Sequence, residues 1–273
     1  MNLRKRRILN TVIFLLIVSV VLAVWNESRQ HLPTTNYWTG WSLLSLMLFL
    51  AAYNLRKKLT FLPLGSSATW MQLHIYAGLL TSVLFLTHLN FSLPTGQLEW
   101  TLTILYFIVF VSGVIGLVTT RLVPKRLSDR GEEVIYQRIP MYRKLLREKA
   151  EQVALESITK TESSLLADFY AKELSPFFSR ARYISWHLIE SRGPLIKLLT
   201  KLDELSHYLS DEEKEYSLEL RELIITKYDL DYKLALQGCL KYWLFIHIPF
   251  TYSLLIFTIL HVILVYAFTG GAS

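Results

Sequence analysis

Four histidines stand out in this chain because of their spacing. Residues 74–88 read HIYAGLLTSVLFLTH and residues 247–261 read HIPFTYSLLIFTILH, so two apolar stretches each begin and end with a histidine. The two histidines are fourteen residues apart in both stretches. Neutral imidazole binds transition metals, and in apolar surroundings it also forms hydrogen bonds between helices. The repeated spacing raises the question of which elements would position four imidazoles.

The composition indicates a membrane protein. Of the 273 residues, 52% are hydrophobic, and the mean hydropathy is +0.33. A helix needs about 20 apolar residues to cross about 30 Å of hydrocarbon. Five runs approach or exceed that length, at 8–25, 37–55, 69–91, 98–120 and 240–268. The sequence therefore predicts five transmembrane helices, of which the third and the fifth carry the histidine pairs.

The basic residues predict how these helices are oriented. Residues 121–239 contribute nothing to the net charge of +7, because their twenty Lys and Arg equal their twenty Asp and Glu. Most of the excess lies beside the spans, at Arg4–Arg7 and Arg56–Lys58. Cytoplasmic loops are rich in Lys and Arg, so we expect the N-terminus and residues 121–239 in the cytoplasm. This distribution reports topology and gives no sign of a nucleic-acid partner.

The predicted fold class is all-α, a five-helix transmembrane bundle with a helical cytoplasmic insertion between helices four and five. Residues 1–120 would hold membrane helices one to four, residues 121–239 the insertion, and residues 240–273 the fifth helix that completes the bundle. We expect such a protein to be integral to the bacterial inner (plasma) membrane.

The insertion shows start and stop signals of helices. They predict helices at about 140–174, 176–192, 194–208 and 211–237, the last of which opens on a capping box, Ser210-Asp211-Glu212-Glu213. Only Gly238 interrupts the apolar pattern between this helix and the fifth span, so the two could be one helix. Neither a G-x-G-x-x-G nor a Walker pattern occurs, which gives the insertion no sign of nucleotide binding.

The histidine spacing matches two stacked metal sites. Fourteen residues of α-helix turn through about 1400° and rise about 21 Å, so the two histidines of one helix share a face but lie near opposite membrane surfaces. Both helices run from inside to outside in the predicted topology. Bis-histidine ligation between facing helices is a normal arrangement for haem b. We therefore predict two haem b groups, with the iron ligated by His74/His247 on the inner side and by His88/His261 on the outer side.

Other uses of the histidines fit less well. Zinc or copper would need several ligands close together, and a proton relay would more naturally include carboxylates, which the two histidine helices lack. Cys239 is the only cysteine, which excludes a Cys-x-x-Cys-His haem attachment and an iron–sulfur site built from cysteine alone. The remaining alternatives are a cofactor-free membrane scaffold, with histidines in helix contacts, and a haem-handling membrane protein.

Two further residues are candidates for cofactor binding. Gly78 follows His74 by about one turn, where the missing side chain would let a flat macrocycle approach the backbone; a small residue would equally help helices to pack. Arg121, together with Lys241 and Arg56, could meet haem propionates at the inner surface. Snorkelling and membrane orientation explain these basic residues equally well.

The paired histidines resemble the ligand pattern of transmembrane di-haem cytochromes b, in which two helices each carry two histidines separated by thirteen residues. Counted over predicted spans two to five, the ligands fall on the second and fourth helices, as in the four-helix cytochrome b core. Counted over all five spans, they fall on the third and fifth, as in the ferric reductase and NADPH oxidase transmembrane domain. Those reductases continue after the fifth span into a flavin- and nicotinamide-binding module, which we do not expect in this protein.

The resemblance implies an electron-transfer subunit of an oxidoreductase complex in place of a complete enzyme. Its two haems would carry electrons across the membrane between a cytoplasmic-side partner and a quinone or extracytoplasmic cytochrome partner. The expected redox subunits are an extracytoplasmic c-type cytochrome or a cytoplasmic dehydrogenase, and the insertion is a plausible platform for the latter.

Overall fold

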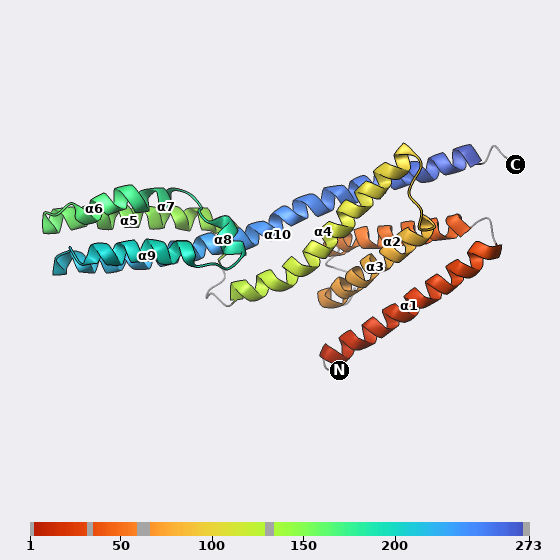
Figure 1. The fold of residues 1–273 in the computed structure, drawn as a ribbon, viewed down its shortest axis with the longest axis horizontal. Helices are drawn as coiled ribbons and strands as arrows, with labels where there is room; N and C mark the ends of the chain where they lie inside the picture. The colour runs from red at the N-terminus through yellow and green to blue at the C-terminus, as the bar shows by residue number, and fades with distance from the viewer. Residues whose placement is uncertain (1–2, 32–34, 59–65, 129–133, 270–273) are drawn as a thin grey trace. The chain divides into compact units, whose positions relative to one another are not determined.

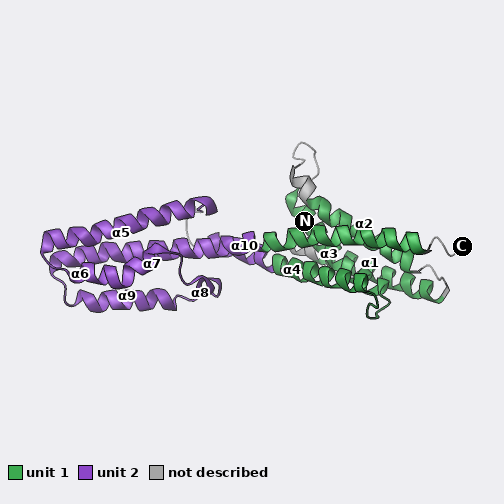
Figure 2. Ribbon diagram, turned by 90° about the horizontal axis from the view of Figure 1, so that it is seen from above, with its two compact units in different colours: residues 1–117, 243–273 green, residues 118–242 purple. Residues whose placement is uncertain are grey.

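The computed structural model describes residues 3–31, 35–58, 66–128 and 134–269, and in these ranges the chain forms helices and no strand (Figure 1). The all-α prediction is confirmed for this part of the chain. Two compact units are present (Figure 2). Unit 1 comprises Met1–Leu117 and Trp243–Ser273, and unit 2 comprises Val118–Tyr242, where the sequence suggested boundaries at 121 and 239.

Unit 1 is built from three complete helices and parts of two others. These are α1 (Leu3–His31), α2 (Thr35–Lys58), α3 (Ser67–His88), most of α4 (Gln97–Ser128) and the last part of α10 (Asp211–Thr269). Its buried core combines residues from four of the helices: Leu43, Met47, Leu84, Phe85, Tyr106, Leu254 and Leu255. The core therefore joins the two histidine-bearing helices, α3 and α10, to α2 and α4.

Four of the described helices are long and apolar enough to cross a membrane: α1, α3, α4 and α10. They coincide with the first, third, fourth and fifth predicted spans. The second predicted span coincides with α2, whose first half carries Asn36, Tyr37 and Trp41 and is correspondingly less apolar. α3 ends at His88, before the predicted end at 91, because Asn90 and Phe91 adopt left-handed conformations with φ of 50° and 56°.

Unit 2 is a separate helical body with its own core. Its helices pack around the first half of α10 and comprise η1 (Tyr136–Arg138), α5 (Ile139–Thr161), α6 (Leu165–Phe169), the π-helical turn η2 (Tyr170–Leu174), α7 (Ser175–Ser179), α8 (Ile184–Leu188) and α9 (Gly193–Ser206). Apolar residues of every long helix meet in the core, which includes Ala150, Leu166, Phe177, Phe178, Leu202, Leu220 and Ile224.

Two of the predicted insertion helices are interrupted. The predicted helix 140–174 breaks at Glu162, which takes a left-handed conformation with φ 56° and donates its N–H to the Ile158 carbonyl. The predicted helix 176–192 breaks after α7, because Arg180 is extended and Tyr183 is left-handed with φ 61°. Both breaks therefore rest on non-glycine residues in conformations that sequence patterns rarely reveal.

The start of α10 agrees with the sequence. The Ser210 N–H donates to the Glu213 carboxylate at 3.0 Å, and the Glu213 N–H donates to the Ser210 hydroxyl at 3.3 Å. This reciprocal pair confirms the predicted capping box. The helix then continues from Asp211 through Gly238 to Thr269, so the last insertion helix and the fifth predicted span are one element.

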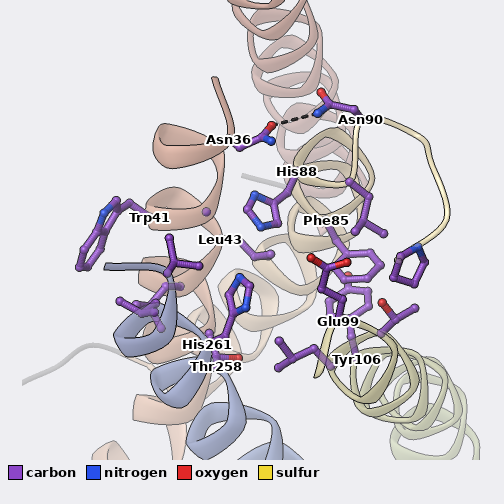
Figure 3. Close-up of a pocket in the computed structure, with 18 of the residues that line it drawn as sticks. Asn36, Trp41, Leu43, Phe85, His88, Asn90, Glu99, Tyr106, Thr258 and His261 are labelled. Atoms are coloured by element: carbon purple, nitrogen blue, oxygen red, sulfur yellow. Dashed lines mark hydrogen bonds between the residues drawn. The ribbon is translucent and has the colours of Figure 1, made fainter. Parts of the chain in front are cut away.

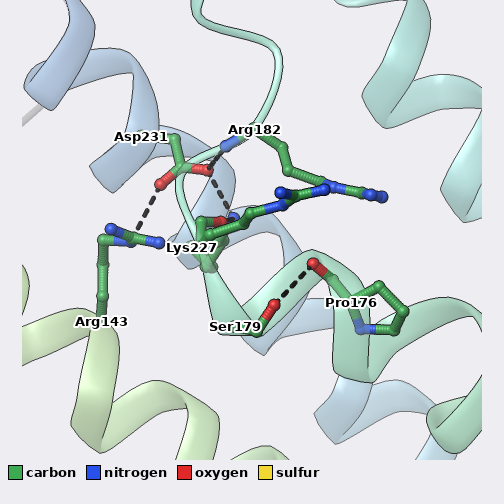
Figure 4. Close-up of polar contacts among 7 residues, drawn as sticks. Arg143, Pro176, Ser179, Arg182, Lys227 and Asp231 are labelled. Carbon is green, nitrogen blue, oxygen red and sulfur yellow. Dashed lines mark hydrogen bonds and ion pairs between the residues drawn. The ribbon is translucent and has the colours of Figure 1, made fainter.

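A buried ionic cluster ties three segments of unit 2 together (Figure 4). The Lys227 ammonium lies 2.5 Å from the Asp231 carboxylate and donates to the Arg180 carbonyl at 3.0 Å. Asp231 also accepts from the Arg182 N–H at 3.1 Å and pairs with the Arg143 guanidinium at 3.1 Å. Burial lowers the pKa of Lys227 to about 8 and raises the pKa of Asp231. The cluster thus joins α5, the 180–183 segment and α10.

Candidate functional site

A cavity of about 480 Å³ lies within unit 1, and both His88 and His261 line it. Its walls come from α2, α3, the turn after α3, α4 and α10. Figure 3 shows His88 from α3 and His261 from α10 projecting into the same space. The volume falls in the range of about 300–1,000 Å³ that is typical of small-molecule and cofactor sites. The structure therefore brings together the predicted outer pair.

Aromatic and aliphatic side chains form most of the cavity wall. Phe85 and Tyr106 both line it and stack on each other, with ring centroids 4.0 Å apart and planes 11° apart. The Tyr106 hydroxyl lies 3.2 Å from the hydroxyl of Thr81, which is itself buried. Leu254 and Thr258 of α10 complete this side. A mostly apolar wall with a few convergent polar groups favours a largely apolar small-molecule ligand.

The His88 ring is held from α2 by Thr39. The threonine hydroxyl lies 3.2 Å from His88 Nδ1, and Thr39 is completely buried. The same hydroxyl donates to the Asn36 carbonyl at 3.1 Å. When the hydroxyl hydrogen is directed to Asn36, the hydroxyl oxygen accepts the Nδ1–H of His88. This arrangement leaves the lone pair of Nε2 available to a ligand or metal.

Gly40 makes room for the same ring. A Cβ atom built on Gly40 would lie 3.0 Å from His88 Cε1, which is closer than nearly all real contacts of this kind. The imidazole therefore rests directly on the α2 backbone. Thr39 and Gly40 of α2 therefore both lie against the His88 ring and limit how it can move.

His247 is held in the same way from α4. The Ser112 hydroxyl lies 2.8 Å from His247 Nδ1 and donates to the Val109 carbonyl at 2.8 Å. When this hydroxyl hydrogen is directed to Val109, the Nδ1–H of His247 is the donor and Nε2 keeps its lone pair. A Cβ on Gly113 would lie 3.7 Å from His247 Cε1, an ordinary van der Waals contact.

Trp243, which precedes His247 by one turn on α10, also holds this histidine in place. Its indole N–H donates to the Ser112 carbonyl at 2.6 Å, and its ring stacks on His247 with centroids 5.4 Å apart. A Cβ on Gly116 would lie only 2.0 Å from Trp243 Cζ2, so a side chain at this position would collide with the indole. The structure thus places Trp243 against α4.

A hydroxyl residue followed by glycine therefore supports two of the four histidines, Thr39-Gly40 for His88 and Ser112-Gly113 for His247. Sequence reasoning missed both pairs. The only signal is that each dipeptide occurs within a predicted span, in NYWTGW and in FVSGVIG. Which histidine each dipeptide contacts depends on how the helices pack, and a sequence pattern does not show that.

The two histidines of the predicted inner pair, His74 and His247, contact different helices. His74 lies against the Tyr53 ring of α2, with centroids 5.1 Å apart, whereas the contacts of His247 are with α4. A Cβ built on Gly78 would meet no heavy atom within 4 Å in the part of the chain that is described, so Gly78 faces open space there. The ligation of one iron by His74 and His247 stays a prediction.

None of the basic residues considered for propionate binding is among the described side chains of unit 1. Arg121 is exposed on the part of α4 that belongs to unit 2. Lys241 also belongs to unit 2, where its ammonium lies 4.9 Å from the centroid of the Tyr136 ring. The side chain of Arg56 is outside the described residues. A role of Arg121 in cofactor binding stays a prediction.

Among the described residues, no group of three or more His, Cys, Asp or Glu side chains could hold a metal ion. Comparison with protein-family models, with curated proteins and with solved structures finds no match for this chain. The resemblance to di-haem cytochromes b therefore rests on the histidine spacing.

Proposed function

We propose that the chain is a di-haem b membrane subunit that moves electrons across a membrane. The observation that carries this proposal is that His88 and His261, which come from two different membrane-capable helices, line one cavity of about 480 Å³. The proposed fold is a five-helix bundle in which α2 crosses the membrane beside the four more apolar helices. Unit 2 would be the cytoplasmic insertion.

The residues around the outer cavity fit a haem. His88 offers an Nε2 lone pair because Thr39 accepts its Nδ1–H, and His261 lines the same space. Haem iron takes four ligands from its own macrocycle, so two imidazoles complete the coordination and no larger cluster of protein ligands is required. Phe85 and Tyr106 would exclude water from the macrocycle faces or edges.

The inner site has partial support. Ser112 can leave the Nε2 lone pair of His247 available, and no described heavy atom lies within 4 Å of a Cβ built on Gly78, one turn from His74. A histidine ligand whose second nitrogen donates a hydrogen bond is oriented and made more basic, which is the role proposed for Ser112 and Thr39.

Bound haem would supply a one-electron couple at its iron, and the protein would set its spacing, orientation and surroundings. Within this proposal the membrane is the bacterial inner membrane, with the N-terminus and unit 2 in the cytoplasm. Electrons would pass between a cytoplasmic-side dehydrogenase and a quinone or an extracytoplasmic c-type cytochrome. The chain would be one subunit of an oxidoreductase complex.

The main competing function is that of a cofactor-free scaffold. Hydrogen bonds between histidine and serine or threonine also join helices without any cofactor, so the contacts of His88 and His247 fit both functions. The cavity between His88 and His261 is what favours a ligand, because a scaffold would gain stability by closing it.

A pyridine haemochrome assay on the purified full-length protein separates the two functions. The proposal predicts haem b at about two per chain in this assay, and the untreated reduced protein should show the absorption spectrum of bis-histidine haem. A purified, folded protein that carries no haem after expression with ample haem supply would exclude it. Haem that binds but exchanges rapidly with apomyoglobin would favour the haem-handling alternative.

A further inference from the structure

α1 lies beside the histidine-bearing helix α3 and turns one face towards it (Figure 1). Between residues 8 and 30, the side chains that are at least partly covered are Asn10, Phe14, Val18, Val21, Trp25 and Ser28. Their spacing of three or four residues places them on one side of the helix. The side chains on the other sides are exposed, among them Leu16 and Val20. α1 therefore contacts the rest of unit 1 through a single stripe.

Near its start, α1 is fastened to α3 by polar side chains. The Asn10 amide donates to the Gln72 side-chain carbonyl at 3.2 Å, and the Thr11 hydroxyl lies 3.2 Å from the Tyr76 hydroxyl. The Phe14 ring packs against the Tyr76 ring, with centroids 5.7 Å apart. Hydrogen bonds between polar side chains are one of the ways in which helices associate in a membrane. This end of α1 is therefore joined to α3 by specific contacts.

Near its other end, α1 is fastened to α3 by Trp25. The indole N–H donates to the Thr87 carbonyl at 3.1 Å, and both Trp25 and Thr87 are buried. The indole also packs edge-on against the Phe91 ring, with centroids 5.3 Å apart. Thr87 precedes His88 in the last turn of α3, where backbone carbonyls have no partner in a following helical turn. The indole therefore secures the end of α3 that carries His88.

The two fastenings have the same register. Asn10 and Gln72 are 62 residues apart in the chain, and so are Trp25 and Thr87. On each helix the two contacts are separated by 15 residues, from 10 to 25 and from 72 to 87, which corresponds to about 22 Å of helical rise. α1 and α3 thus run parallel over that length. It is nearly the same length as the interval between the two histidines of α3.

The contacts of the first fastening reach α3 from the side away from its histidines. Gln72 and Tyr76 are four residues apart and share a face, whereas His74 lies about 200° around the helix from Gln72. The histidine side meets other parts of unit 1: the His74 ring lies 5.1 Å from the Tyr53 ring of α2, and His88 lines the cavity. α1 thus holds α3 without occupying the side where a ligand would bind.

We propose that α1 is a positioning helix, whose contacts through Asn10 and Trp25 set the height and the rotation of α3 and thereby the places of His74 and His88. A slip of α3 by one residue would change the height of an imidazole by about 1.5 Å and its direction by about 100°, and binding sites require far closer placement. Neither Asn10 nor Trp25 lines the cavity, so each acts through α3. The inference rests on the proposed function only for what the histidines bind.

Cysteine cross-linking tests the register in the full-length protein in nanodiscs. Asn10→Cys/Gln72→Cys, in a Cys239→Ser background, would be treated with a short bis-methanethiosulfonate reagent and analysed by mass spectrometry after proteolysis. Asn10→Cys/Leu79→Cys is the matched control, because residue 79 lies on the same face of α3 two turns further on. We expect a severalfold higher yield for the first pair. Equal yields would overturn the proposal, because α1 would then have no fixed register on α3.

Two single substitutions test what this packing does for the histidines. Trp25→Phe removes the indole N–H but keeps an aromatic ring, and Asn10→Leu removes the amide. The readouts are the EPR g values and the midpoint potential of each haem, which respond to how the axial imidazoles are held. We expect Trp25→Phe to shift those of the outer haem, identified as the one that His88→Ala lacks, and Asn10→Leu to shift those of the inner haem. Ser19→Ala is the control, because the Ser19 hydroxyl donates to the Leu15 carbonyl of α1 itself.

Three results decide between the possible roles of α1. Haem spectra and potentials of both variants that match those of Ser19→Ala would overturn the positioning role, even where the cross-links form in the expected register. Equal shifts of both haems in each variant would also contradict it, because they would indicate a general loosening of the bundle. A wild-type protein without haem would instead refute the proposed function, and the cross-linking yields, which need no haem, would then decide alone whether α1 positions α3.

Discussion

The Ser112 hydroxyl on α4 lies 2.8 Å from Nδ1 of His247 on α10 and 2.8 Å from the Val109 carbonyl of its own helix. Thr39 stands in the same relation to His88, at 3.2 Å. In the tautomer in which Nδ1–H donates to these hydroxyls, Nε2 carries the lone pair. Hydrogen bonds of this kind to metal-binding histidines raise the basicity of the ligand and hold its orientation.

Replacing Ser112 by alanine should weaken the inner haem site. The Nδ1–H of His247 would lose its acceptor, and loss of such partners typically lowers metal affinity about 10–100-fold. An optical redox titration of the purified variant should show a changed midpoint potential or lower occupancy for one haem, with the other unaltered. Ser82→Ala is the control, because the Ser82 hydroxyl only donates to the Leu79 carbonyl of its own helix. Equal effects of the two substitutions would argue against a positioning role for Ser112.

Gly40→Ala should disturb the outer site. The new Cβ would lie 3.0 Å from His88 Cε1, so the imidazole or α2 must shift by a few tenths of an ångström. We expect haem content to fall towards one per chain, measured by the pyridine haemochrome assay. Gly238→Ala offers a control, because its Cβ would make ordinary contacts of 3.9 Å with Tyr136 and Tyr242. Unchanged haem content in Gly40→Ala would show that the close approach of His88 to α2 is not needed for binding.

Gly78→Ala distinguishes a haem protein from a cofactor-free scaffold. Without a cofactor the added Cβ meets no described heavy atom within 4 Å, and a glycine-to-alanine change within a helix should stabilise the protein by up to about 1 kcal/mol. With a macrocycle beside His74, the same methyl group should reduce haem occupancy of the inner site. The measurements are thermal stability and haem content of the purified protein. If the variant is more stable and keeps its full haem content, no haem lies against Gly78.

Features that depend on neighbouring residues could be predicted from the sequence, whereas features that depend on helix packing could not. The helices of unit 1 and the capping box at Ser210 and Glu213 depend on apolar run length and on residues three apart, so they could be predicted. The break at Glu162 could not, because a left-handed glutamate has no sequence signature. The Thr39 and Ser112 contacts depend on which helices lie side by side. The four histidines were identifiable because their spacing is itself a helical repeat, but the cavity joining His88 and His261 required the structure.

The Lys227–Asp231 pair predicts a specific pH dependence of stability. Burial lowers the pKa of Lys227 from 10.5 to about 8 in the folded protein. Between these values the unfolded chain binds more protons at this lysine than the folded chain does, so stability rises with pH, by at most about 1.4 kcal/mol per pH unit. Below about pH 8 the lysine is charged in both states, so it adds no pH dependence and the cost of burying its charge is constant.

The comparison of the wild-type protein with Lys227→Met isolates this contribution, because the other titrating groups largely cancel. Thermal unfolding from pH 7 to pH 9.5 should show the wild type gaining stability relative to the variant only above about pH 8. Asp231→Asn should destabilise the protein by about 3–5 kcal/mol, because it leaves buried cations without their partner. A wild-type-to-variant difference that stays constant with pH would mean that Lys227 keeps its ordinary proton affinity in the folded state.

Haem stoichiometry in paired-ligand variants tests the central claim most directly. The wild-type protein should contain about two haems b per chain, and His88→Ala, His261→Ala and the double variant should each contain about one, because the two histidines serve one iron. The remaining haem in all three variants should have the same spectrum and midpoint potential. A wild-type protein without haem, or a double variant that loses twice as much haem as either single variant, would contradict the assignment of His88 and His261 to a shared site.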